Sequence, residues 1–500
     1  TDLIPGTAVL FIVFLFTLWA FRFHQRRTRF PPGPRPWLFL GNLLQKDVLP
    51  LFNTYTKVRH KRYGPVFTVW LGTQPMVVIC GIEAVKDALI THNEEFGGRP
   101  PVPILDQVTK GFGLISEHEK WKMVRRFTIS TLRNFGMGKK SMAERISEET
   151  HCLVEKIASF KGQPFDIIPT VRATVSNVMC SVIFGNRFSY EDKKFTELLE
   201  ILEAFVTFFV SLPGLVDVYS FSPASSHTLP NIMNFLPGPH KKIFSDCKKV
   251  CDFIRNEVDT HKETLDPENP RDFIDCFLLK LEKEQNSSII CMEDLVMSVF
   301  QLFIGGTDTT SSVISYALVL LARFSDVQVK IQQEIDEIVG VNRAPSMENR
   351  MKMPYTNAFA HEILRILRVT NENFPRMTTQ DVNFRGHFIP QGTAILPLLV
   401  SMHFDPLHWE DPENFHPFHF LDKKGEFQKK DAYMPFSAGK RACPGEALAD
   451  MELFLIFSIL LQHFTFELII DPEEIDLEVL YMGCRKKGKY HYLRAIKRKI

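Results

Sequence analysis

The 500-residue sequence lacks a strong charge of either sign and lacks any paired cysteine motif. Its formal net charge is +1, so no bulk electrostatic attraction indicates nucleic acid as a partner. The nine cysteines are odd in number and widely scattered, and none forms a C-x-x-C motif. These absences argue against a disulfide framework or a zinc site, and they indicate a reducing compartment.

Nucleotide-binding fingerprints and internal repeats are also missing. The sequence holds neither a G-x-G-x-x-G motif after a strand nor a P-loop, which excludes the common dinucleotide and nucleoside triphosphate sites. No repeat, low-complexity block or long flexible linker divides the chain after residue 50. Phenylalanine, by contrast, is abundant at 44 residues, which indicates a large core and an apolar pocket. We therefore expect one large domain over residues 46–500.

The N-terminus holds one long apolar run over residues 3–23, long enough to span a bilayer as a helix. The basic residues near the end of this run are Arg22, Arg26, Arg27 and Arg29. By the positive-inside rule they place the following domain in the cytosol. A cleaved signal peptide is the alternative, but it would carry basic residues before the apolar run and small residues at a cleavage site. We therefore expect residues 1–29 to be a single-pass signal anchor with a basic stop, and residues 30–45 to be a stiff proline-rich hinge.

Hydrophobic patterning indicates the coarse secondary structure. Residues 65–81 are β-branched and aromatic around a Gly-Thr turn, which predicts a hairpin. From about 140 to 340, apolar residues recur at three- and four-residue spacing, which predicts mainly helix. Short strand-like segments return around 383–400 and after 465. The patterning therefore indicates an α-rich, mixed fold.

The most specific motif is F-x-x-G-x-R-x-C-x-G near the C-terminus, filled by Phe436, Gly439, Arg441, Cys443 and Gly445. Gly439 can take a positive φ in a tight turn and can let a flat ligand approach the backbone. Arg441 offers a planar fork of donors that suits a carboxylate. Cys443 precedes an apolar helix, whose first amide groups and dipole favour a thiolate. A buried structural cysteine is the alternative, and the five filled positions argue against it.

This loop resembles the haem-binding signature of the cytochrome P-450 family, and the resemblance covers about residues 30–470. It implies a mainly α fold with small β-sheets, an α-rich prism around a buried haem. The implied cofactor is haem b, with its iron held by an axial thiolate from Cys443 and a propionate facing Arg441. Such a thiolate directs electron density towards the iron and favours O–O cleavage.

A long apolar helix is predicted over residues 293–324, and it contains two adjacent glycines, Gly305 and Gly306. Each glycine costs roughly 1 kcal/mol against alanine in a helix, so we expect a compensating role and a local kink or bulge. Gly305 and Thr309 lie four residues apart and share a helix face. The segment matches the A/G-G-x-D/E-T motif of the family, in which Asp308 relays protons to Thr309 for oxygen activation. A kinked buried helix with polar residues on its wet face is the alternative.

Further residues match the family by position. Glu362 and Arg365 form its E-x-x-R pair, which resembles a structural lock behind the haem rather than a catalytic dyad. His419 stands where many members carry arginine as a third partner, so that lock is expected to be weaker or pH-sensitive. The remaining matches are implied partners of the haem propionates, namely Trp121, Arg125, Arg376 and Arg99.

The resemblance is closest to the animal microsomal branch that oxidises drugs and lipids, and it implies where a substrate pocket lies. Ordinary core packing is the alternative for each phenylalanine in these regions. The pocket candidates are Leu114, Phe208, Phe300, Phe303, Ile304, Val369 and Phe374. The segment 481–490 departs from the family pattern, because it is basic where an apolar turn into the pocket is usual.

The implied activity is that of a membrane-bound haem-thiolate monooxygenase facing the cytosol from the endoplasmic reticulum membrane. It would hydroxylate or epoxidise lipophilic substrates such as fatty acids, steroids, drugs or other xenobiotics with O₂. Because the chain has no nucleotide site of its own, electrons would come from NADPH–cytochrome reductase, with cytochrome b5 as a further donor. The alternatives are a haem-thiolate isomerase or dehydratase acting on lipid peroxides, and a non-catalytic haem sensor.

Overall fold

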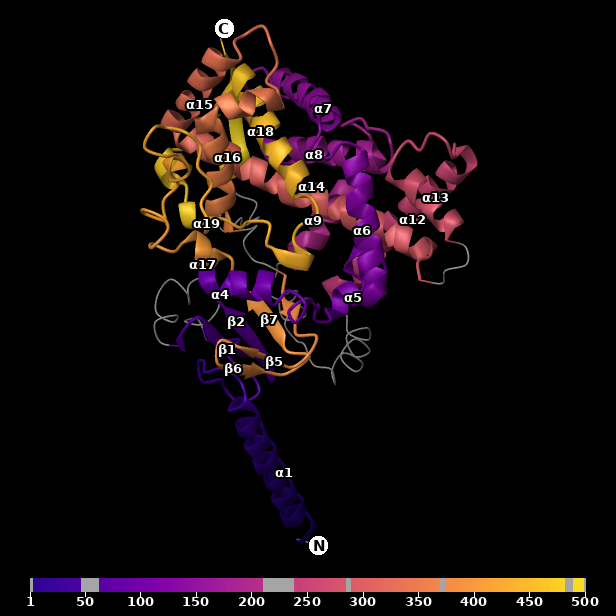
Figure 1. Cartoon of the computed structure of the whole chain (residues 1–500), viewed down its shortest axis with the longest axis vertical. Coiled ribbons are helices and arrows are strands. Elements are labelled where there is room, and N and C mark those ends of the chain that lie inside the picture. Colours follow the sequence, from indigo (N-terminus) through magenta and orange to yellow (C-terminus); the bar gives the residue numbers. More distant parts are fainter. Residues whose placement is uncertain are drawn as a thin grey trace.

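The computed structural model describes residues 3–45, 63–209, 238–284, 289–368, 374–481 and 489–498. Helices form the broad body of the molecule, and its largest sheet lies at the end from which α1 projects (Figure 1). The predicted fold class, mainly α with small β-sheets, is confirmed.

Two helices cross the middle of the body. α14 (Met292–Arg323) is buried along most of its length and packs against α8 (Ile167–Ile183), which is also buried on nearly every side. Helices that are apolar all round are enclosed by other elements in this way. α14 matches the helix predicted over 293–324, but it continues as α-helix through Gly305 and Gly306 without the predicted bulge. Packing of its buried faces therefore stabilises the helix at both glycines, although glycine itself disfavours a helix.

The other helices surround this pair, and they confirm the mainly helical pattern predicted for 140–340. α18 packs on α7 and also contacts α14, while α16 contacts α18 and α14. The bounds are α4 (Ile82–Lys86), α5 (Pro103–Thr109), α6 (His118–Asn134), α7 (Lys140–Ser159), α9 (Lys193–Phe209), α12 (Pro239–Thr264), α13 (Phe273–Lys283), α15 (Ser325–Ile338), α16 (Pro354–Ile366), α17 (Val400–His403), α18 (Glu446–His463) and α19 (Leu477–Tyr481).

A four-stranded sheet lies at the same end of the body as α1 (Figure 1). β1 (Val66–Leu71) and β2 (Gln74–Ile79) form the predicted hairpin, with Val66 opposite Ile79. β2 pairs in parallel with β7 (Ala394–Pro397), and β7 pairs antiparallel with β4 (Arg376–Met377). The sheet thus joins segments more than 300 residues apart, and β4 holds Arg376 at its edge.

Two smaller sheets confirm the other predicted strands. β8 (Phe464–Leu468) lies between the end of α18 and the C-terminus, and it pairs with β9 (Tyr492–Lys497), which also pairs with β3 (Phe165–Asp166). β5 (Val382–Phe384) and β6 (His387–Ile389) form a two-stranded hairpin beside the larger sheet.

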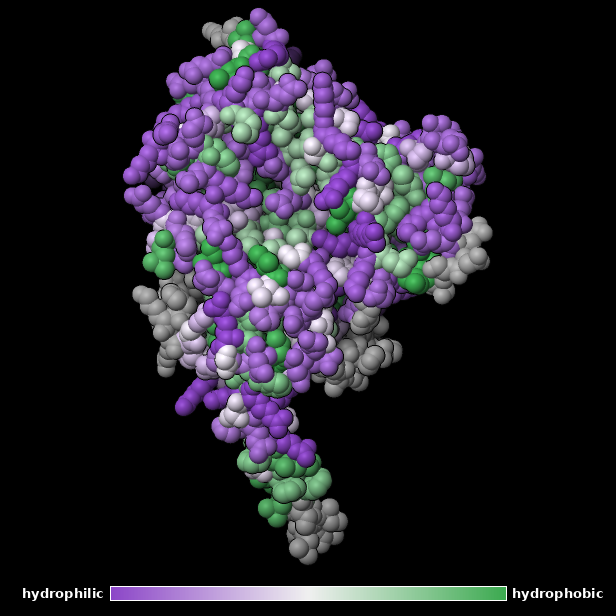
Figure 2. Space-filling model, in the orientation of Figure 1, coloured by the Kyte–Doolittle hydropathy of each residue, from purple (hydrophilic) through white to green (hydrophobic). Residues whose placement is uncertain are grey.

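The N-terminal helix α1 (Leu3–Arg27) extends away from the body, and hydrophobic side chains cover its projecting part (Figures 1 and 2). Its segment Ala8–Arg27 is long and apolar enough to cross a membrane, which confirms the predicted apolar helix and fits a membrane anchor. Its base is held by aromatic contacts. Trp19 stacks on Phe39 with ring centroids 4.5 Å apart, and Phe23 meets Trp70 edge-on at 5.0 Å.

Candidate active site

The Cys443 loop forms a tight turn that leads directly into α18. The Cys443 amide donates to the Phe436 carbonyl at 2.9 Å, which closes the loop. Gly439 has the predicted positive φ, at 72°, and a Cβ on it would lie 2.0 Å from the Leu89 carbonyl oxygen. In the structure, therefore, packing of the turn against the backbone of residues 87–91 requires this glycine, whereas the sequence suggested the approach of a ligand. The Cys443 residue itself is exposed.

Two opposing influences act on the Cys443 thiol. Although the residue as a whole is exposed, the protein atoms around the sulfur desolvate it and raise its pKa, while backbone hydrogen bonds from Gly445 and Glu446 and the charge of Arg125 lower the pKa. The amide groups at the start of α18 thus act as expected, but they do not outweigh burial. A metal ion deprotonates a coordinating thiol outright, so the amides are suited to stabilising the thiolate once a metal has bound.

One face of α14 is accessible although the rest of the helix is buried. Gly305 and Thr309 are exposed on this face, and a Cβ built on Gly305 would meet no atom within 4 Å. The Thr309 hydroxyl donates to the Gly305 carbonyl at 2.8 Å, as expected for a threonine that satisfies the backbone beside a glycine. Open space therefore lies against the predicted oxygen-handling face. Asp308 is 2% exposed, so proton transfer through it requires a path inside the protein.

Five predicted haem partners meet around the Cys443 loop, although they come from distant parts of the chain. Arg125 on α6 donates to the Ala442 carbonyl, and Arg376 on β4 donates to Ser437 Oγ at 3.1 Å. Arg441 donates to the Gly97 carbonyl at 3.1 Å, and its Cζ lies 3.5 Å from the centroid of the Trp121 ring. Arg99 donates to the carbonyls of residues 374 and 375 at 2.9 and 2.8 Å.

These four arginines form a cluster of like charge in which Arg376 is buried and the other three are half-buried. Burial and mutual repulsion lower the pKa of Arg99, Arg376 and Arg441 to about 9 each. Burial also lowers the pKa of Arg125. Arg376 Nε is buried and has no hydrogen-bond partner. Like charges gathered out of water require an anion among them, and two carboxylates on a flat ligand would supply it.

Comparison with known proteins decides which ligand this is. The family model for cytochrome P450 matches residues 31–492. The chain belongs to the cytochrome P450 family. It is 44% identical over 470 residues to cytochrome P450 2C5 of Oryctolagus cuniculus, covering 94% of each chain. It is 42% identical over 467 residues to cytochrome P450 2G1 of Rattus norvegicus, with 93% of this chain and 92% of that protein covered. Cytochrome P450 2C44 of Mus musculus is 40% identical over 503 residues, and 99% of each chain is covered.

Cytochromes P450 are monooxygenases that bind haem iron through a cysteine thiolate, and the site fits this cofactor. The arginine cluster offers the cations that propionates require, and the exposed Cys443 offers a thiolate. The open space at Gly305 leaves room beside the backbone of α14. When bound, the haem supplies the activation of O₂.

The E-x-x-R pair is a buried ion pair that ties three segments together. Glu362 and Arg365 are both fully buried, and two hydrogen bonds of 2.7 Å join them. Arg365 also donates to the carbonyls of His403, Pro412 and Asn414. Burial alone would raise the pKa of Glu362, but the charge and hydrogen bonds of Arg365 and His419 outweigh it and lower the pKa. The pair thus has the contacts of a structural lock.

His419 joins this lock through both ring nitrogens. Nδ1 lies 3.1 Å from Glu362 Oε1, and Nε2 faces the Glu410 carbonyl oxygen. Both partners are acceptors, and a neutral imidazole has only one N–H to donate. Both contacts can therefore be hydrogen bonds at the same time only when the ring carries two protons.

The predicted pocket residues differ in how far they are buried. Leu114, Phe208 and Ile304 are half-buried, whereas Phe374 is 49% exposed beside Arg99. The two phenylalanines of α14 are buried in the core. Phe300 meets Phe205 of α9 edge-on at 6.1 Å, and Phe303 meets Phe184 in the same way at the end of α8. Val369 lies outside the described residues, as does most of the segment 481–490.

Gln301 is a site residue that the sequence analysis missed. Its Oε1 accepts from the amides of Leu114 and Ile115 at 2.5 and 3.2 Å, and its Nε2 donates to the Phe112 carbonyl at 3.1 Å. It thereby fixes the turn 112–115 to α14. Gln301 lies four residues before Gly305, on the same helix face, and this spacing is the signal that could have identified it.

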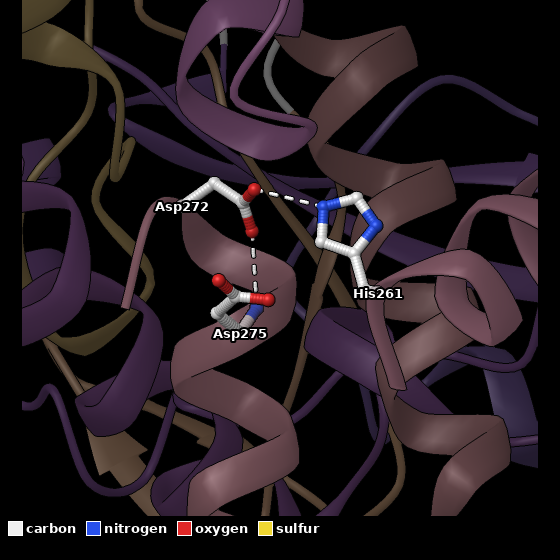
Figure 3. Close-up of side chains that lie close together, drawn as sticks. All are labelled: His261, Asp272 and Asp275. Atoms are coloured by element: carbon white, nitrogen blue, oxygen red, sulfur yellow. Dashed lines mark hydrogen bonds and ion pairs between the residues drawn. The ribbon is translucent and has the colours of Figure 1, made fainter. Parts of the chain in front are cut away.

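A separate cluster of titratable groups, His261, Asp272 and Asp275, joins α12 to α13 (Figure 3). His261 Nε2 lies 2.8 Å from Asp272 Oδ2, and its Nδ1 lies 2.7 Å from the Glu257 carbonyl oxygen. Asp272 caps α13 by accepting from the Asp275 amide, and Asp275 pairs with Arg271. The ligand atoms that a metal would need are thus engaged by protein partners, and the cluster is a buried structural link between the two helices.

Proposed function

We propose that this cytochrome P450 is a membrane-anchored enzyme that oxidises lipophilic small molecules with electrons from NADPH–cytochrome reductase. Hydroxylation or epoxidation of fatty acids, steroids, drugs or other xenobiotics is the proposed chemistry. The observation that carries the proposal is the juxtaposition of Cys443, which is exposed, with the arginine cluster around its loop. This arrangement provides a metal ligand and the counter-charges for two propionates in one place.

Each predicted site residue has a proposed task. Cys443 binds the iron, and the Cys443 loop with Phe436 and Gly439 holds the sulfur in place. Trp121, Arg125, Arg441, Arg376 and Arg99 bind the propionates. Thr309 presents a hydroxyl to the open space beside Gly305. That hydroxyl donates its hydrogen to the Gly305 carbonyl. The lone pairs on the Thr309 oxygen therefore remain free to accept a hydrogen bond from a donor in the open space. Asp308 supplies protons to this face from within the protein.

Electron delivery by an acidic flavoprotein is supported by basic residues close to the Cys443 loop. α6 carries Trp121 and Arg125 at the loop, and it also carries the exposed Arg126 and Arg133. Complementary charge steers a partner towards such a surface. Lys440 already pairs with Glu94, so we assign it a smaller share in docking. Cytochrome b5, which would use the same charge complementarity, is proposed as a second donor.

Location in the endoplasmic reticulum membrane, with the catalytic domain in the cytosol, is supported by α1 and by the loop beside it. Arginines at the end of α1 favour the cytosolic side. The loop that Trp19 contacts exposes Trp37, Leu38 and Phe39, which are each 45% exposed or more. Deletion of residues 1–29 should release much of the protein from membranes, and complete retention would contradict a sole N-terminal anchor.

The thiolate assignment is tested by spectroscopy of the reduced protein with CO. The wild type should show the red-shifted Soret band of thiolate ligation, and Cys443→His should lose it. Cys152→Ser is the matched control, because Cys152 is a partly buried thiol on α7. A Cys443→His variant that retains the band would contradict the assignment.

The reaction is tested by reconstitution with NADPH–cytochrome reductase and a panel of fatty acids, steroids and drugs. NADPH consumption coupled to an oxygenated product supports the proposal. Turnover of a lipid hydroperoxide without NADPH that survives Thr309→Ala would instead indicate an isomerase or dehydratase. Haem binding with no reductase-dependent NADPH consumption on any panel member would indicate a sensor.

A further inference from the structure

A fully buried carboxylate, that of Asp294, lies in the first turn of α14 and accepts hydrogen bonds from two segments of the chain. Its Oδ2 accepts from the Cys291 amide at 3.0 Å, and the Cys291 thiol also lies 3.4 Å from this oxygen. Its Oδ1 accepts from the Gly113 amide at 3.1 Å, across 181 residues of sequence. The bond to Cys291 is an ordinary cap at the start of a helix. The bond to Gly113, by contrast, connects α14 to a distant turn.

Lys120 on α6 forms an ion pair with this carboxylate. Its Nζ lies 3.4 Å from Asp294 Oδ2 and 4.5 Å from the centroid of the Phe112 ring. An ammonium group over an aromatic face is attracted to the ring. Lys120 therefore contacts both the carboxylate that binds Gly113 and the residue that precedes Gly113. Because Asp294 is out of water, loss of this counter-charge would leave its own charge poorly compensated.

The turn 112–115 fits closely against α14. Gly113 has a φ of 79°, and a Cβ on it would lie 2.6 Å from Gln301 Oε1 and 3.0 Å from Met297 Cβ. Asp294, Met297 and Gln301 are spaced by three and four residues, so they form one stripe along the helix. The seven residues from the first to the last of them span about 10 Å, or about two helical turns. The turn thus lies along this stripe, with Asp294 bound at one end and Gln301 at the other.

The same stripe leads to the open space of the active site. Gly305 lies four residues after Gln301, which is about 6 Å along the helix axis, and a Cβ on Gly305 would meet no atom within 4 Å. The turn that covers the stripe as far as Gln301 therefore bounds the open space at the end nearer the start of α14. It carries two apolar side chains, those of Leu114 and Ile115, neither of which is fully buried. The position of this turn thus limits the space that an apolar ligand can occupy beside Gly305.

We propose that Asp294, paired with Lys120, is a positioning residue for substrate specificity, because it holds the turn 112–115 on α14 and so fixes the boundary of the pocket beside Gly305. This inference rests on the proposed function and adds to it two residues remote from Cys443. The ligand part that meets the boundary is the apolar chain of a lipophilic substrate. A boundary already held in place binds such a chain with little further ordering, which favours chains that reach it. Loosening the boundary lowers the affinity for those ligands and leaves shorter ones unaffected.

Spectral titration of the full-length haem protein with imidazole and with N-dodecylimidazole tests this selectivity without turnover. Both ligands bind the iron through a ring nitrogen and shift the Soret band, but only the second carries a long apolar chain. Asp294→Asn keeps the shape and one acceptor oxygen, but it loses the charge that faces Lys120. Its affinity for N-dodecylimidazole should fall about tenfold, the factor for one weakened charge-assisted hydrogen bond, while its affinity for imidazole should not change. Equal losses for both ligands, or no loss for either, would overturn the proposal.

Lys120→Met separates the positioning role from the capping of α14, because it leaves both amide bonds of Asp294 in place. Its affinity for N-dodecylimidazole should fall about threefold, and hydrogen exchange in a peptide that covers the turn 112–115 should become faster. Lys122→Met is the matched control and should change neither measurement, since Lys122 pairs with Glu119 on the same helix and both side chains are more than half exposed.

Unchanged exchange in the turn of Lys120→Met would show that the ion pair does not hold it, and the proposal would be wrong. This variant also provides the test if Asp294→Asn does not fold. The Soret band with CO, measured on the same samples, reports separately on thiolate ligation. Failure of the proposed monooxygenase reaction would not alter either titration, because neither imidazole has to be oxidised.

Discussion

Arg441 stacks on Trp121, with its Cζ 3.5 Å from the centroid of the indole ring. The contact joins the Cys443 loop to α6, and it holds the guanidinium plane in one orientation. A planar cation is well suited to this position because it can stack and still donate from its edge. Arg441 uses that edge to donate to the Gly97 carbonyl.

Arg441→Lys should weaken haem retention by about tenfold, since an ammonium group keeps the charge but loses stacking and the planar fork. The measurement is the ratio of haem to protein absorbance after gel filtration at decreasing concentration. Arg133→Lys, an exposed position on α6, is the control and should leave the ratio unchanged. Equal retention by both variants would show that charge alone decides haem binding.

Glu362→Gln should destabilise the protein by about 3–5 kcal/mol at neutral pH, because Arg365 is left buried without its counter-charge. The folded-state pKa of Glu362 is lowered from 4.5, so the stability from this pair is complete above that pH. It is lost as pH falls through the folded pKa. Denaturant titrations of both proteins should therefore converge at acidic pH, and a constant difference would contradict the ion pair.

His261→Gln should lower the free energy of unfolding mainly below the pKa of the imidazole, whereas Glu362→Gln should lower it mainly above the pKa of the carboxyl. Burial would lower the pKa of His261, but the hydrogen bonds and charge of Asp272 and its surroundings raise it above 6.5. The stability that the charged ring contributes is complete below 6.5 and is lost as pH rises through the folded pKa. The wild type and the variant should thus differ most in mildly acidic buffer. A difference that grows towards alkaline pH would disprove this sign.

Gln301→Leu should alter substrate affinity while leaving the CO-bound Soret band unchanged. The substitution removes the three hydrogen bonds that fix the turn 112–115 to α14, and this loss corresponds to roughly tenfold or more. Spectral titration with the best substrate of the panel measures the dissociation constant. Gln301→Glu, which keeps the acceptor for Leu114, should show the smaller change.

Local sequence patterns predicted the secondary structure around the site better than they predicted which residues contact one another across the fold. The helix over 293–324, the hairpin over 65–81 and the positive φ of Gly439 all follow from short-range preferences, and the structure confirms them. Contacts across the fold could not be read in this way. Arg441 reaches Gly97 and Gln301 reaches Leu114, over separations of 344 and 187 residues.

Helical spacing separates the residues of α14 that share the face of Gly305 from those that point into the core. Phe303 lies two residues before Gly305, which is about 200° around a helix of 3.6 residues per turn. The structure accordingly places Phe303 against the end of α8, and Thr307, one turn further, contacts Ser176 of α8. Gln301, four residues before Gly305, is buried and faces the turn 112–115 instead. Helical spacing does not predict that Phe300 contacts Phe205 of α9, because this contact depends on how two distant segments pack.

The arginine cluster has a consequence for how the protein is maintained in a cell. Four cations that are partly or wholly shielded from water repel one another, and an anionic cofactor among them offsets that repulsion. A ligand that binds only the folded state stabilises it by mass action, by about 2.7 kcal/mol at a hundred times its dissociation constant. The haem supply should therefore control how much of this protein survives quality control, independently of how much is synthesised.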